Sequence, residues 1–292
     1  MKILILGGSG MIGHNFFLSW RKRHDVRVTL KEGLENYLSH GFYNQKNSFF
    51  NCDASSIEKL TEVIDSFEPD CVVNCIGVTK QLCCQENIEN VLMINSVLPH
   101  KIDYICKIRR IRFIHLSTDC VFTGEKGNYK ESDTPDATDL YGRSKVLGEV
   151  DSTTSLTIRK STIGLELNNK HGLLEWFLAQ EKSIEGYSGA IYSGLSTTHL
   201  ASIIEEIIVE KPSLNKILNI ASEPISKFTL LCELRDRLED CDIEIIEDDK
   251  ISVDRSLAPS KLLKETDINI PSWDQMLDDL AKEINERKYD IK

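Results

Sequence analysis

The sequence has no long hydrophobic run. Its apolar start, Ile3–Leu6, meets Gly7 at once, and such a run is too short for the apolar core of a signal peptide or for a membrane-spanning helix. We therefore expect no membrane partner and a cytoplasmic location. Linkers rich in proline or glycine, low-complexity tracts and internal repeats are missing as well. Any two lobes should accordingly share a cleft instead of moving on a tether.

Positive charge and paired cysteines are also scarce. The chain has 46 acidic against 35 basic side chains, and a net charge of -11 without a compact basic stripe argues against nucleic acid as a partner. The nine cysteines are an odd number, and their spacings include neither C-x-x-C nor the Cys/His pattern of a zinc site. We expect no metal and reduced, mostly buried thiols at Cys52, Cys71, Cys75, Cys83, Cys84, Cys106, Cys120, Cys232 and Cys241.

The chain does contain short β-branched runs that alternate with longer amphipathic stretches. This alternation is typical of β-α-β units, and 292 residues suffice for one large α/β domain with a smaller lobe. It predicts a doubly wound parallel sheet, a Rossmann domain that binds NADP, over residues 1–160 with a returning segment near 187–222, and a mainly substrate-binding lobe over 161–292. We expect strands at Lys2–Leu6, Val26–Leu30, Ser48–Asn51, Cys71–Cys75, Arg112–Ser117 and Leu156–Arg159, and helices at Met11–Arg23, Ile57–Phe67, Val91–Lys107, Tyr141–Val150, Gly172–Gln180, Thr198–Val209 and Trp273–Ile284.

Three glycines follow the first predicted strand and open the first predicted helix. Gly7, Gly10 and Gly13 have the spacing G-x-x-G-x-x-G, which lets the backbone turn sharply, approach a pyrophosphate and pack a helix on a strand. The free N–H groups at the helix start, around Met11 and Ile12, would then face the phosphates of a dinucleotide. A glycine-rich turn that binds nothing is the alternative.

The end of the second strand bears on the choice between NAD and NADP. An acidic side chain about 20 residues beyond the glycine turn would bind the ribose 2′-hydroxyl of NAD. Here that place is filled by Thr29 or Lys31, and a cation suits the 2′-phosphate of NADP. Lys31 therefore favours NADPH, whereas the adjacent Glu32 keeps NADH as an alternative. A surface lysine without a ligand is the third interpretation.

Tyr141 and Lys145 are four positions apart on a predicted helix and should share one face. A nearby ammonium would stabilise the phenolate and lower the tyrosine pKa toward neutrality, where the phenol can act as acid or base. On their own, the two residues could be an ordinary surface pair. However, Ser117, Thr118 and Asp119 follow the fifth predicted strand, at the sheet edge where open α/β folds bind ligands. A hydroxyl there can polarise a substrate carbonyl.

These motifs resemble the dTDP-4-dehydrorhamnose reductase family of extended short-chain dehydrogenases. The likeness is most distinctive in Ser-Thr-Asp-Cys-Val-Phe-Thr-Gly at 117–124 and in Tyr-Gly-x-Ser-Lys-x-x-Gly-Glu at 141–149, with Tyr129, Glu131 and Asp133 between them. Pro69–Cys75 is similar to the fourth strand of the family. The resemblance implies a sugar-nucleotide 4-ketoreductase on a Rossmann fold.

The resemblance also implies a role for each matching residue. Thr118 would hydrogen-bond the substrate oxygen, Tyr141 would deliver the proton and Lys145 would hold the nicotinamide ribose, while the nicotinamide supplies the hydride. Asp53 would lie near the adenine, and Asn95 would be a structural asparagine beside the active site. Further cofactor contacts are expected at Cys75, Ile76 and Gly77, and substrate contacts at Asp119, Arg255 and Trp176.

Some of these positions have more than one interpretation. Arg255, in a stretch similar to the substrate-lobe signature of the family, could bind a nucleotide diphosphate or form a surface salt bridge in an acidic lobe. Trp176 and Arg159 are better explained as core residues or supports of the site. Cys120 takes the place where sugar-nucleotide 4,6-dehydratases have the glutamate base. Ketone reduction therefore fits better than water elimination.

The sequence thus predicts NADPH-dependent reduction of the 4-keto group of a nucleotide-linked 4-keto-6-deoxyhexose, in the synthesis of a deoxysugar for surface polysaccharide. It leaves a homodimer open. A nucleotide-sugar epimerase that retains NAD is one alternative. A non-catalytic regulatory subunit of the methionine adenosyltransferase type is the other, because that subunit resembles the same family.

Overall fold

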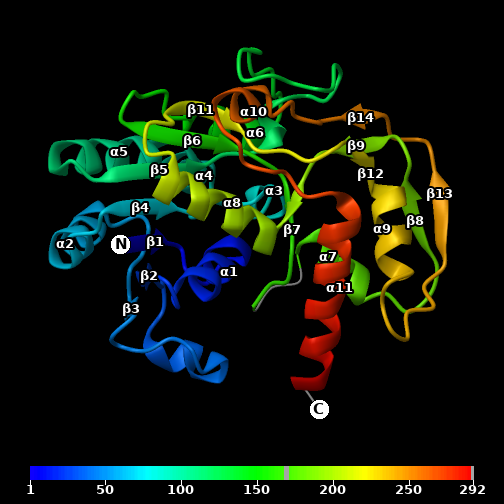
Figure 1. Cartoon of the computed structure of the whole chain (residues 1–292), viewed down its shortest axis with the longest axis horizontal. Coiled ribbons are helices and arrows are strands. Elements are labelled where there is room, and N and C mark those ends of the chain that lie inside the picture. Colours follow the sequence, from blue (N-terminus) through cyan, green and yellow to red (C-terminus); the bar gives the residue numbers. More distant parts are fainter. Residues whose placement is uncertain (168–170, 291–292) are drawn as a thin grey trace.

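A computed structural model of the chain describes residues 1–167 and 171–290. Its largest layer is the predicted doubly wound sheet, with strand order β11-β6-β5-β4-β1-β2-β3 (Figure 1). All pairings in this sheet are parallel. Its strands are β1 (Lys2–Leu6), β2 (Asp25–Thr29), β3 (Ser48–Phe49), β4 (Cys71–Asn74), β5 (Arg112–Leu116), β6 (Ser155–Arg159) and β11 (Lys216–Asn219).

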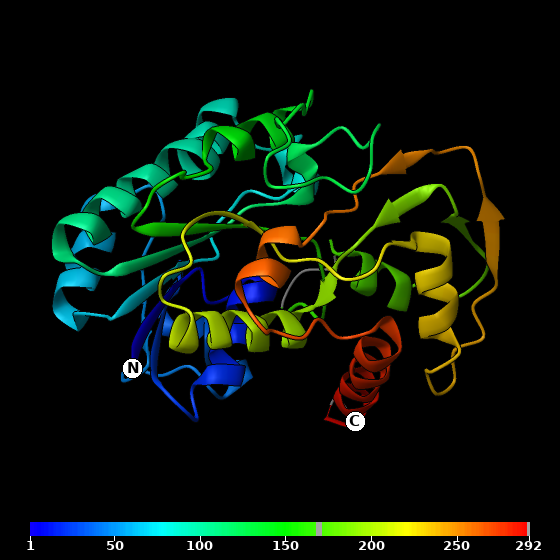
Figure 2. The same cartoon turned by 45° about the horizontal axis from the view of Figure 1, so that its top comes forward.

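Helices cover both faces of this sheet (Figure 2). In β1, Ile3 and Ile5 enter one hydrophobic cluster and Leu4 and Leu6 enter another, because successive side chains of a strand point to opposite faces. The first cluster includes side chains of α1 (Met11–Trp20) and α8 (Thr197–Glu210), and the second includes those of α2 (Ile57–Phe67) and α5 (Leu98–Arg109). A strand buried on both faces explains why the run is apolar throughout.

The helix predicted at Val91–Lys107 is instead interrupted. It consists of α4 (Ile88–Leu92), a π-helical turn η2 (Met93–Val97) and α5. The side chain of Asn95 lies in this turn and is buried. Single π-helical turns inside helices are frequent at functional sites, and here the turn coincides with an asparagine that bonds to two other segments.

The second lobe combines short strands with helices. Its small sheets have the orders β12-β9-β14 and β13-β8, and β10 pairs with β7 in a further two-stranded sheet. The remaining elements are η1 (Leu34–His40), α3 (Lys80–Cys83), η3 (Asp119–Val121), α6 (Leu140–Leu147), β7 (Thr162–Ile163), α7 (Leu173–Leu178), β8 (Ile184–Tyr187), β9 (Ala190–Tyr192), β10 (Leu195–Ser196), β12 (Ile225–Ser226), α9 (Lys227–Arg235), β13 (Ile245–Asp248), β14 (Val253–Asp254), α10 (Ser260–Glu265) and α11 (Trp273–Asp290).

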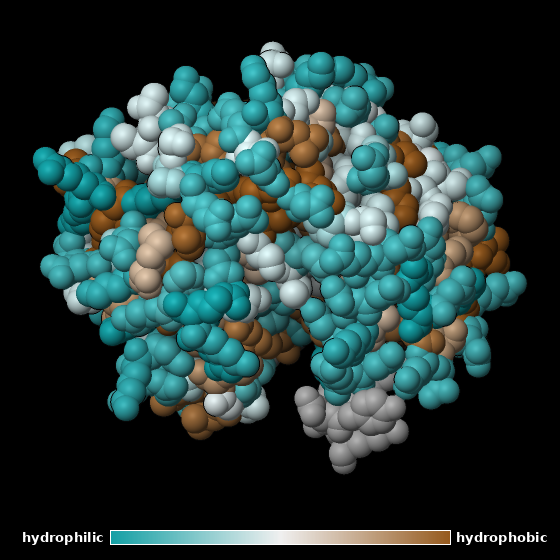
Figure 3. All heavy atoms as spheres, viewed as in Figure 1, coloured by the Kyte–Doolittle hydropathy of each residue, from teal (hydrophilic) through white to brown (hydrophobic). Residues whose placement is uncertain are grey.

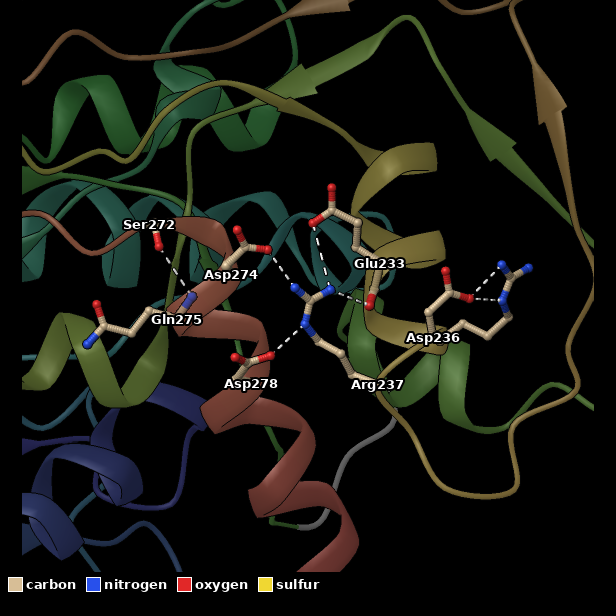
Figure 4. A network of polar contacts seen from close by, with 8 residues as sticks. Glu233, Asp236, Arg237, Ser272, Asp274, Gln275 and Asp278 are labelled. Atoms are coloured by element: carbon tan, nitrogen blue, oxygen red, sulfur yellow. Dashed lines mark hydrogen bonds and ion pairs between the residues drawn. The ribbon is translucent and has the colours of Figure 1, made fainter.

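Arg237 joins the end of α9 to α11. Its Nε donates to Asp278 at 2.7 Å, one terminal nitrogen donates to Asp274 at 2.6 Å, and the other donates to the carbonyl oxygen of Glu233 at 2.9 Å (Figure 4). A single guanidinium thus satisfies three acceptors from two helices. This network fixes the C-terminal helix to the second lobe.

The outer surface is mostly hydrophilic on the face seen in Figure 3, with hydrophobic residues in smaller groups. Among the described residues, none of the helices combines the length and apolarity needed to cross a membrane. All nine cysteines lie among the described residues and carry free thiols; four are buried, four are half-buried and Cys84 is exposed. The expectation of mostly buried thiols therefore holds for four of the nine.

Candidate active site

The glycine turn lies at the carboxyl end of β1. Gly7 has a φ of +84°, and a Cβ on Gly13 would lie 2.1 Å from the carbonyl oxygen of Gly7. Gly8, which the sequence analysis did not single out, is needed because its Cβ would lie 2.5 Å from Val28. At Gly10, by contrast, the nearest atom would be 3.6 Å away. The packing of the chain thus requires three of these glycines, whereas a Cβ at Gly10 would make only an ordinary van der Waals contact.

Gly10 lies at the start of α1. Gly10 is the N-cap of the helix, no side chain caps it, and the first turn carries no acidic residue. The first N–H groups of a helix have no intrahelical acceptor and carry partial positive charge. The residues at this end therefore suit a phosphate group.

Lys31 and Asp53 lie beside each other at the end of β2. The Lys31 ammonium is 3.7 Å from a carboxylate oxygen of Asp53, and both side chains are exposed. Hydrogen bonds from Ser55, with a smaller effect of Lys31, hold the pKa of Asp53 below its ordinary value. Thr29 is buried, and its hydroxyl accepts from the N–H of Gly7 at 3.1 Å. Of the two candidates for the 2′-phosphate, only Lys31 is thus exposed to a ligand.

The strip from Cys75 to Gly77 runs from the glycine turn to α6. A Cβ on Gly7 would lie 3.2 Å from the nitrogen of Ile76, and a Cβ on Gly77 would lie 4.0 Å from Nζ of Lys145. Three predicted cofactor residues therefore lie between the glycine turn and the predicted catalytic lysine.

Asn95 holds the end of that strip in place. Its side-chain oxygen accepts from the N–H of Val78 at 2.8 Å, and its amide nitrogen donates to the Val78 carbonyl and to the Ser144 hydroxyl, each at 3.0 Å. Its side chain is thus occupied by protein atoms. The structural role that the resemblance implied fits this arrangement.

The run Ser-Lys-x-x-Gly-Glu at 144–149 is explained by packing. A Cβ on Gly148 would lie 1.9 Å from the carbonyl oxygen of Asn95, so that only glycine fits there. Glu149 accepts from the Ser117 hydroxyl at 2.7 Å and forms two hydrogen bonds with Arg159, at 2.8 and 2.7 Å. Arg159 is buried, which confirms its interpretation as a support. Through these hydrogen bonds Glu149, which follows α6, connects the end of that helix to the ends of β5 and β6.

Thr118 and Tyr141 meet at the carboxyl edge of the sheet. Thr118 caps η3, and its hydroxyl accepts from the N–H of Cys120 at 3.1 Å and donates to a carboxylate oxygen of Asp119 at 3.0 Å. Tyr141 lies close to this turn, because a Cβ on the next residue, Gly142, would be 2.4 Å from the carbonyl oxygen of Cys120. Tyr141 is placed there by α6, which is capped by Asp139 through a 2.7 Å bond from the N–H of Gly142. Residues far apart in the sequence are thus brought to one edge of the sheet.

The expected lowering of the Tyr141 pKa is wrong for this structure. Burial raises the pKa of the Tyr141 phenol well above its usual range, and nearby Cys120 adds to the effect. Burial also lowers the pKa of Lys145 to about 7, with a further contribution from Lys160. The Lys145 amine donates to the carbonyl oxygen of Leu116 at 2.8 Å. Since desolvation disfavours both charged forms, the phenol is held in its protonated form.

Arg255 lines a cavity of about 320 Å³ whose wall also includes Cys120 and Asp139. Its Nε donates to the carbonyl oxygen of Phe122 at 2.9 Å, and the described residues include no carboxylate within ion-pair distance of it. The surface salt bridge is therefore not what the structure shows. Trp176 lies on α7 with 40% of its surface exposed, so its interpretation as a core residue is wrong. Its contact with a substrate stays a prediction.

Two polar residues near Asp119 escaped the sequence analysis. Lys160 follows β6 directly, as Thr118 follows β5 closely, and this position after a strand was a signal that could have been used. Tyr192, on β9, has a buried phenol oxygen without a hydrogen-bond partner among the described residues. Nothing in the local sequence distinguishes it, because only the folding of the second lobe brings it near Asp119.

Comparisons with known proteins agree with this arrangement. The family described as RmlD substrate binding domain matches residues 1–163. The chain is 36% identical over 155 residues to the probable low-salt glycan biosynthesis reductase Agl14 of Haloferax volcanii, which covers 51% of the chain and 48% of the relative. It is 28% identical over 236 residues to a dTDP-4-dehydrorhamnose reductase of Aggregatibacter actinomycetemcomitans, covering 76% and 74%.

A third relative is named differently. Methionine adenosyltransferase 2 subunit beta of Danio rerio is 28% identical over 152 residues, which is 51% of the chain and 42% of that protein. The chain thus matches about half the length of the Haloferax and Danio relatives.

Two solved structures share the architecture over nearly the whole chain. A hypothetical dTDP-4-dehydrorhamnose reductase from Sulfolobus tokodaii is 27% identical, with a TM-score of 0.75 and coverage of 94% of this chain and 98% of that one. A dTDP-4-dehydrorhamnose reductase from Bacillus anthracis in complex with NADP is 17% identical, with a TM-score of 0.78 and coverage of 97% and 99%. At that low identity the second structure establishes the fold only.

Proposed function

Because the chain belongs to the RmlD substrate binding domain family, we propose that it uses NADPH to reduce the 4-keto group of a nucleotide-linked 4-keto-6-deoxyhexose. The observation that carries the proposal is that α6, which carries Tyr141 and the buried Lys145, packs against the η3 turn that follows Thr118, at the sheet edge where the strip from Cys75 to Gly77 also lies. The reductase named in Aggregatibacter and the glycan reductase named in Haloferax support the substrate class. We place the reaction in the cytoplasm, in deoxysugar synthesis for surface polysaccharide.

The residues present fit a dinucleotide. Gly10 leaves space at an uncapped helix start, Lys31 offers a cation for a 2′-phosphate, and Gly77 keeps the strip beside Lys145 free of a side chain. NADPH bound there would supply the hydride. The exposed Lys31 ammonium is the feature that favours NADPH, and NADH remains the alternative.

The protonation state of Tyr141 suits reduction. A carbonyl that receives hydride must also receive a proton, and a buried phenol whose pKa is raised holds one. Lys145 lies where it can bind a ribose hydroxyl beside Gly77, and Arg255 lines the cavity that would take the nucleotide diphosphate.

The test is the loss of NADPH absorbance with a panel of nucleotide-linked 4-keto-6-deoxyhexoses. Tyr141→Phe should keep its NADPH affinity and lose a factor of roughly 10²–10⁴ in turnover, because it removes the proton donor alone. Tyr104→Phe, a change at a tyrosine that is 64% exposed on α5, serves as the matched control and should keep full activity. No turnover of any sugar by a protein that binds NADPH would refute the proposal. Near-normal turnover by Tyr141→Phe would refute the assigned proton donor.

A second candidate is favoured by the match to the Danio rerio subunit. A regulatory subunit would bind a methionine adenosyltransferase and would reduce none of the sugars in the panel. A nucleotide-sugar epimerase would instead purify with tightly held NAD. The same preparation distinguishes these outcomes, and light scattering on it tests the homodimer that the sequence leaves open.

A further inference from the structure

The cavity that Arg255 lines has more acidic than basic groups in its wall. Among the described residues that line it, one is a cation (Arg255) and two are carboxylates (Glu125 and Asp139). The diphosphate of a nucleotide sugar carries negative charge on both phosphates, so a wall with an excess of carboxylates would oppose its binding. A further positive charge near the wall is therefore needed for such a ligand.

Lys80 supplies that charge from α3, which packs beside α6. Its ammonium donates to one carboxylate oxygen of Asp139 at 2.8 Å, and this bond uses one of its three N–H donors. Because 48% of the Lys80 side chain is exposed, its other donors can reach a ligand. The second Asp139 oxygen accepts from the N–H of Gly142 at 2.7 Å. One carboxylate thus joins the ammonium to the start of α6, the helix that carries Tyr141.

Arg255 presents further donors to the same cavity. Its Nε donates to the carbonyl oxygen of Phe122 at 2.9 Å, which uses one of its five N–H donors. Its backbone N–H donates to the carbonyl oxygen of Ile191 at 3.0 Å, so β9 holds the residue in place. The planar guanidinium matches the geometry of a phosphate. The two cations therefore come to the cavity from separate segments, Arg255 directly after β14 and Lys80 at the start of α3.

We propose that Lys80 is a substrate-binding residue, whose ammonium binds the diphosphate of the nucleotide sugar together with the guanidinium of Arg255. Asp139 holds the ammonium at the cavity. Because the same carboxylate caps α6, it also fixes the bound diphosphate relative to the helix that carries Tyr141. The identity of the substrate rests on the proposed function, whereas diphosphate binding can be measured without any turnover.

The first experiment measures binding by calorimetry to the full chain saturated with NADPH, so that the glycine turn is already filled. The probes are inorganic pyrophosphate and the diphosphates of thymidine, uridine, guanosine, cytidine and adenosine. Lys80→Met should weaken each diphosphate that binds the wild type by about tenfold, because it removes a charge-assisted hydrogen bond. The Kd for NADPH should stay within about twofold, since exposed ion pairs contribute little to the fold. Equal diphosphate affinities, or no diphosphate bound by the wild type, would overturn the proposal.

Asp139→Asn tests whether the ammonium binds the ligand or only neutralises the carboxylate. Asparagine caps a helix as well as aspartate does, so α6 should keep its start. In this background Lys80→Met should still weaken diphosphate binding by roughly threefold or more, since the ammonium contacts the phosphate itself. If Lys80→Met has no effect there, Lys80 acts only by neutralising Asp139, and the proposed direct contact is wrong.

With a sugar from the panel, Lys80→Met should raise KM about tenfold and change kcat by less than about threefold, because a remote binding contact is lost equally from ground and transition state. Lys80→Arg should restore most of the KM, and an unchanged KM in Lys80→Met would contradict the proposal. Lys59→Met is the matched control, since Lys59 also forms an ion pair and its side chain is 45% exposed; it should leave KM and the diphosphate Kd unchanged. If the wild-type chain turns over no sugar, the proposed function fails, and the diphosphate affinities still decide the role of Lys80.

Discussion

At the scale of single residues, desolvation is the main cause of the pKa shifts in the site. Tyr141, Lys145 and Lys160 each have a pKa shifted in the direction that disfavours the charged form, and burial is the first cause in every case. The sequence spacing of Tyr141 and Lys145 suggested mutual stabilisation of charge. It could not show that the Lys145 amine would instead bond to the Leu116 carbonyl, because that contact depends on how α6 lies on β5.

Lys145 should make the stability of the ligand-free protein depend on pH. Its pKa is about 7 in the folded chain and about 10.4 in an unfolded one. Between these values the unfolded state binds more protons, so the free energy of unfolding should rise with pH; below pH 7 the full penalty of burying the ammonium is present. In urea titrations Lys145→Met should therefore exceed the wild type in stability most at pH 6, with the difference shrinking toward pH 9.

A surface lysine provides the control for that comparison. Lys59 lies on α2 in an exposed pair with Glu62, and Lys59→Met should give a difference from the wild type that does not change over the same pH range. A pH-independent difference for Lys145→Met would show that its amine does not titrate in that range.

At the scale of elements, the glycines of the turn differ in whether the fold or the ligand requires them. Gly13 is needed by the fold, since its Cβ would lie 2.1 Å from the carbonyl oxygen of Gly7. Gly10 is not needed by the fold, since its Cβ would meet nothing closer than 3.6 Å. The sequence pattern places both in one motif and does not tell them apart.

The two glycines should therefore respond differently to alanine. Gly13→Ala should destabilise the chain by roughly 1–3 kcal/mol through overpacking. Gly10→Ala should stay within about 1 kcal/mol of the wild type but weaken NADPH binding at least tenfold, because the added methyl group occupies the space at the helix start. Thermal unfolding and NADPH fluorescence titration measure the two effects. Equal NADPH affinity in Gly10→Ala and the wild type would argue against phosphate binding at this helix.

The helix predicted at Val91–Lys107 differs from the structure in a way that the sequence pattern could not indicate. The apolar spacing of Val91–Lys107 predicts one continuous helix, whereas the structure inserts the π-helical turn Met93–Val97. The turn carries Asn95, whose bonds go to Val78 and Ser144. The spacing of apolar residues indicates which face of a helix is buried, but it does not indicate hydrogen bonds to distant segments.

At the scale of the whole molecule, the two lobes share one hydrophobic cluster. It extends from Ile3 of β1 and Trp20 of α1 to Trp273 and Met276 of α11. The indole nitrogen of Trp20 donates to the carbonyl oxygen of Ala201 at 3.1 Å, and that of Trp273 donates to the carbonyl oxygen of Glu223 at 2.7 Å. A core shared in this way should make the lobes unfold together.

Single-tryptophan variants test that expectation. One variant retains Trp20 (Trp176→Phe with Trp273→Phe), and another retains Trp273 (Trp20→Phe with Trp176→Phe). In each, the fluorescence transition in urea should coincide with the loss of helix measured by circular dichroism, as a two-state transition requires. A Trp273 signal that is lost well before the circular dichroism changes would show that the second lobe unfolds by itself.

The sequence by itself determined the large sheet, its main helices, the glycine turn and the family, because these depend on local periodicity, strand-to-helix turns and short motifs that a chain carries along its length. It did not predict α9 or the short strands of the second lobe, where propensities are weak and pairing with distant strands decides the structure. Only the tertiary structure decided the direction of the Tyr141 pKa shift, the hydrogen-bond partner of Lys145 and the backbone hydrogen bond between Asp119 and Lys160. These depend on burial and on which strand ends become neighbours, and both arise only when the sheet has formed.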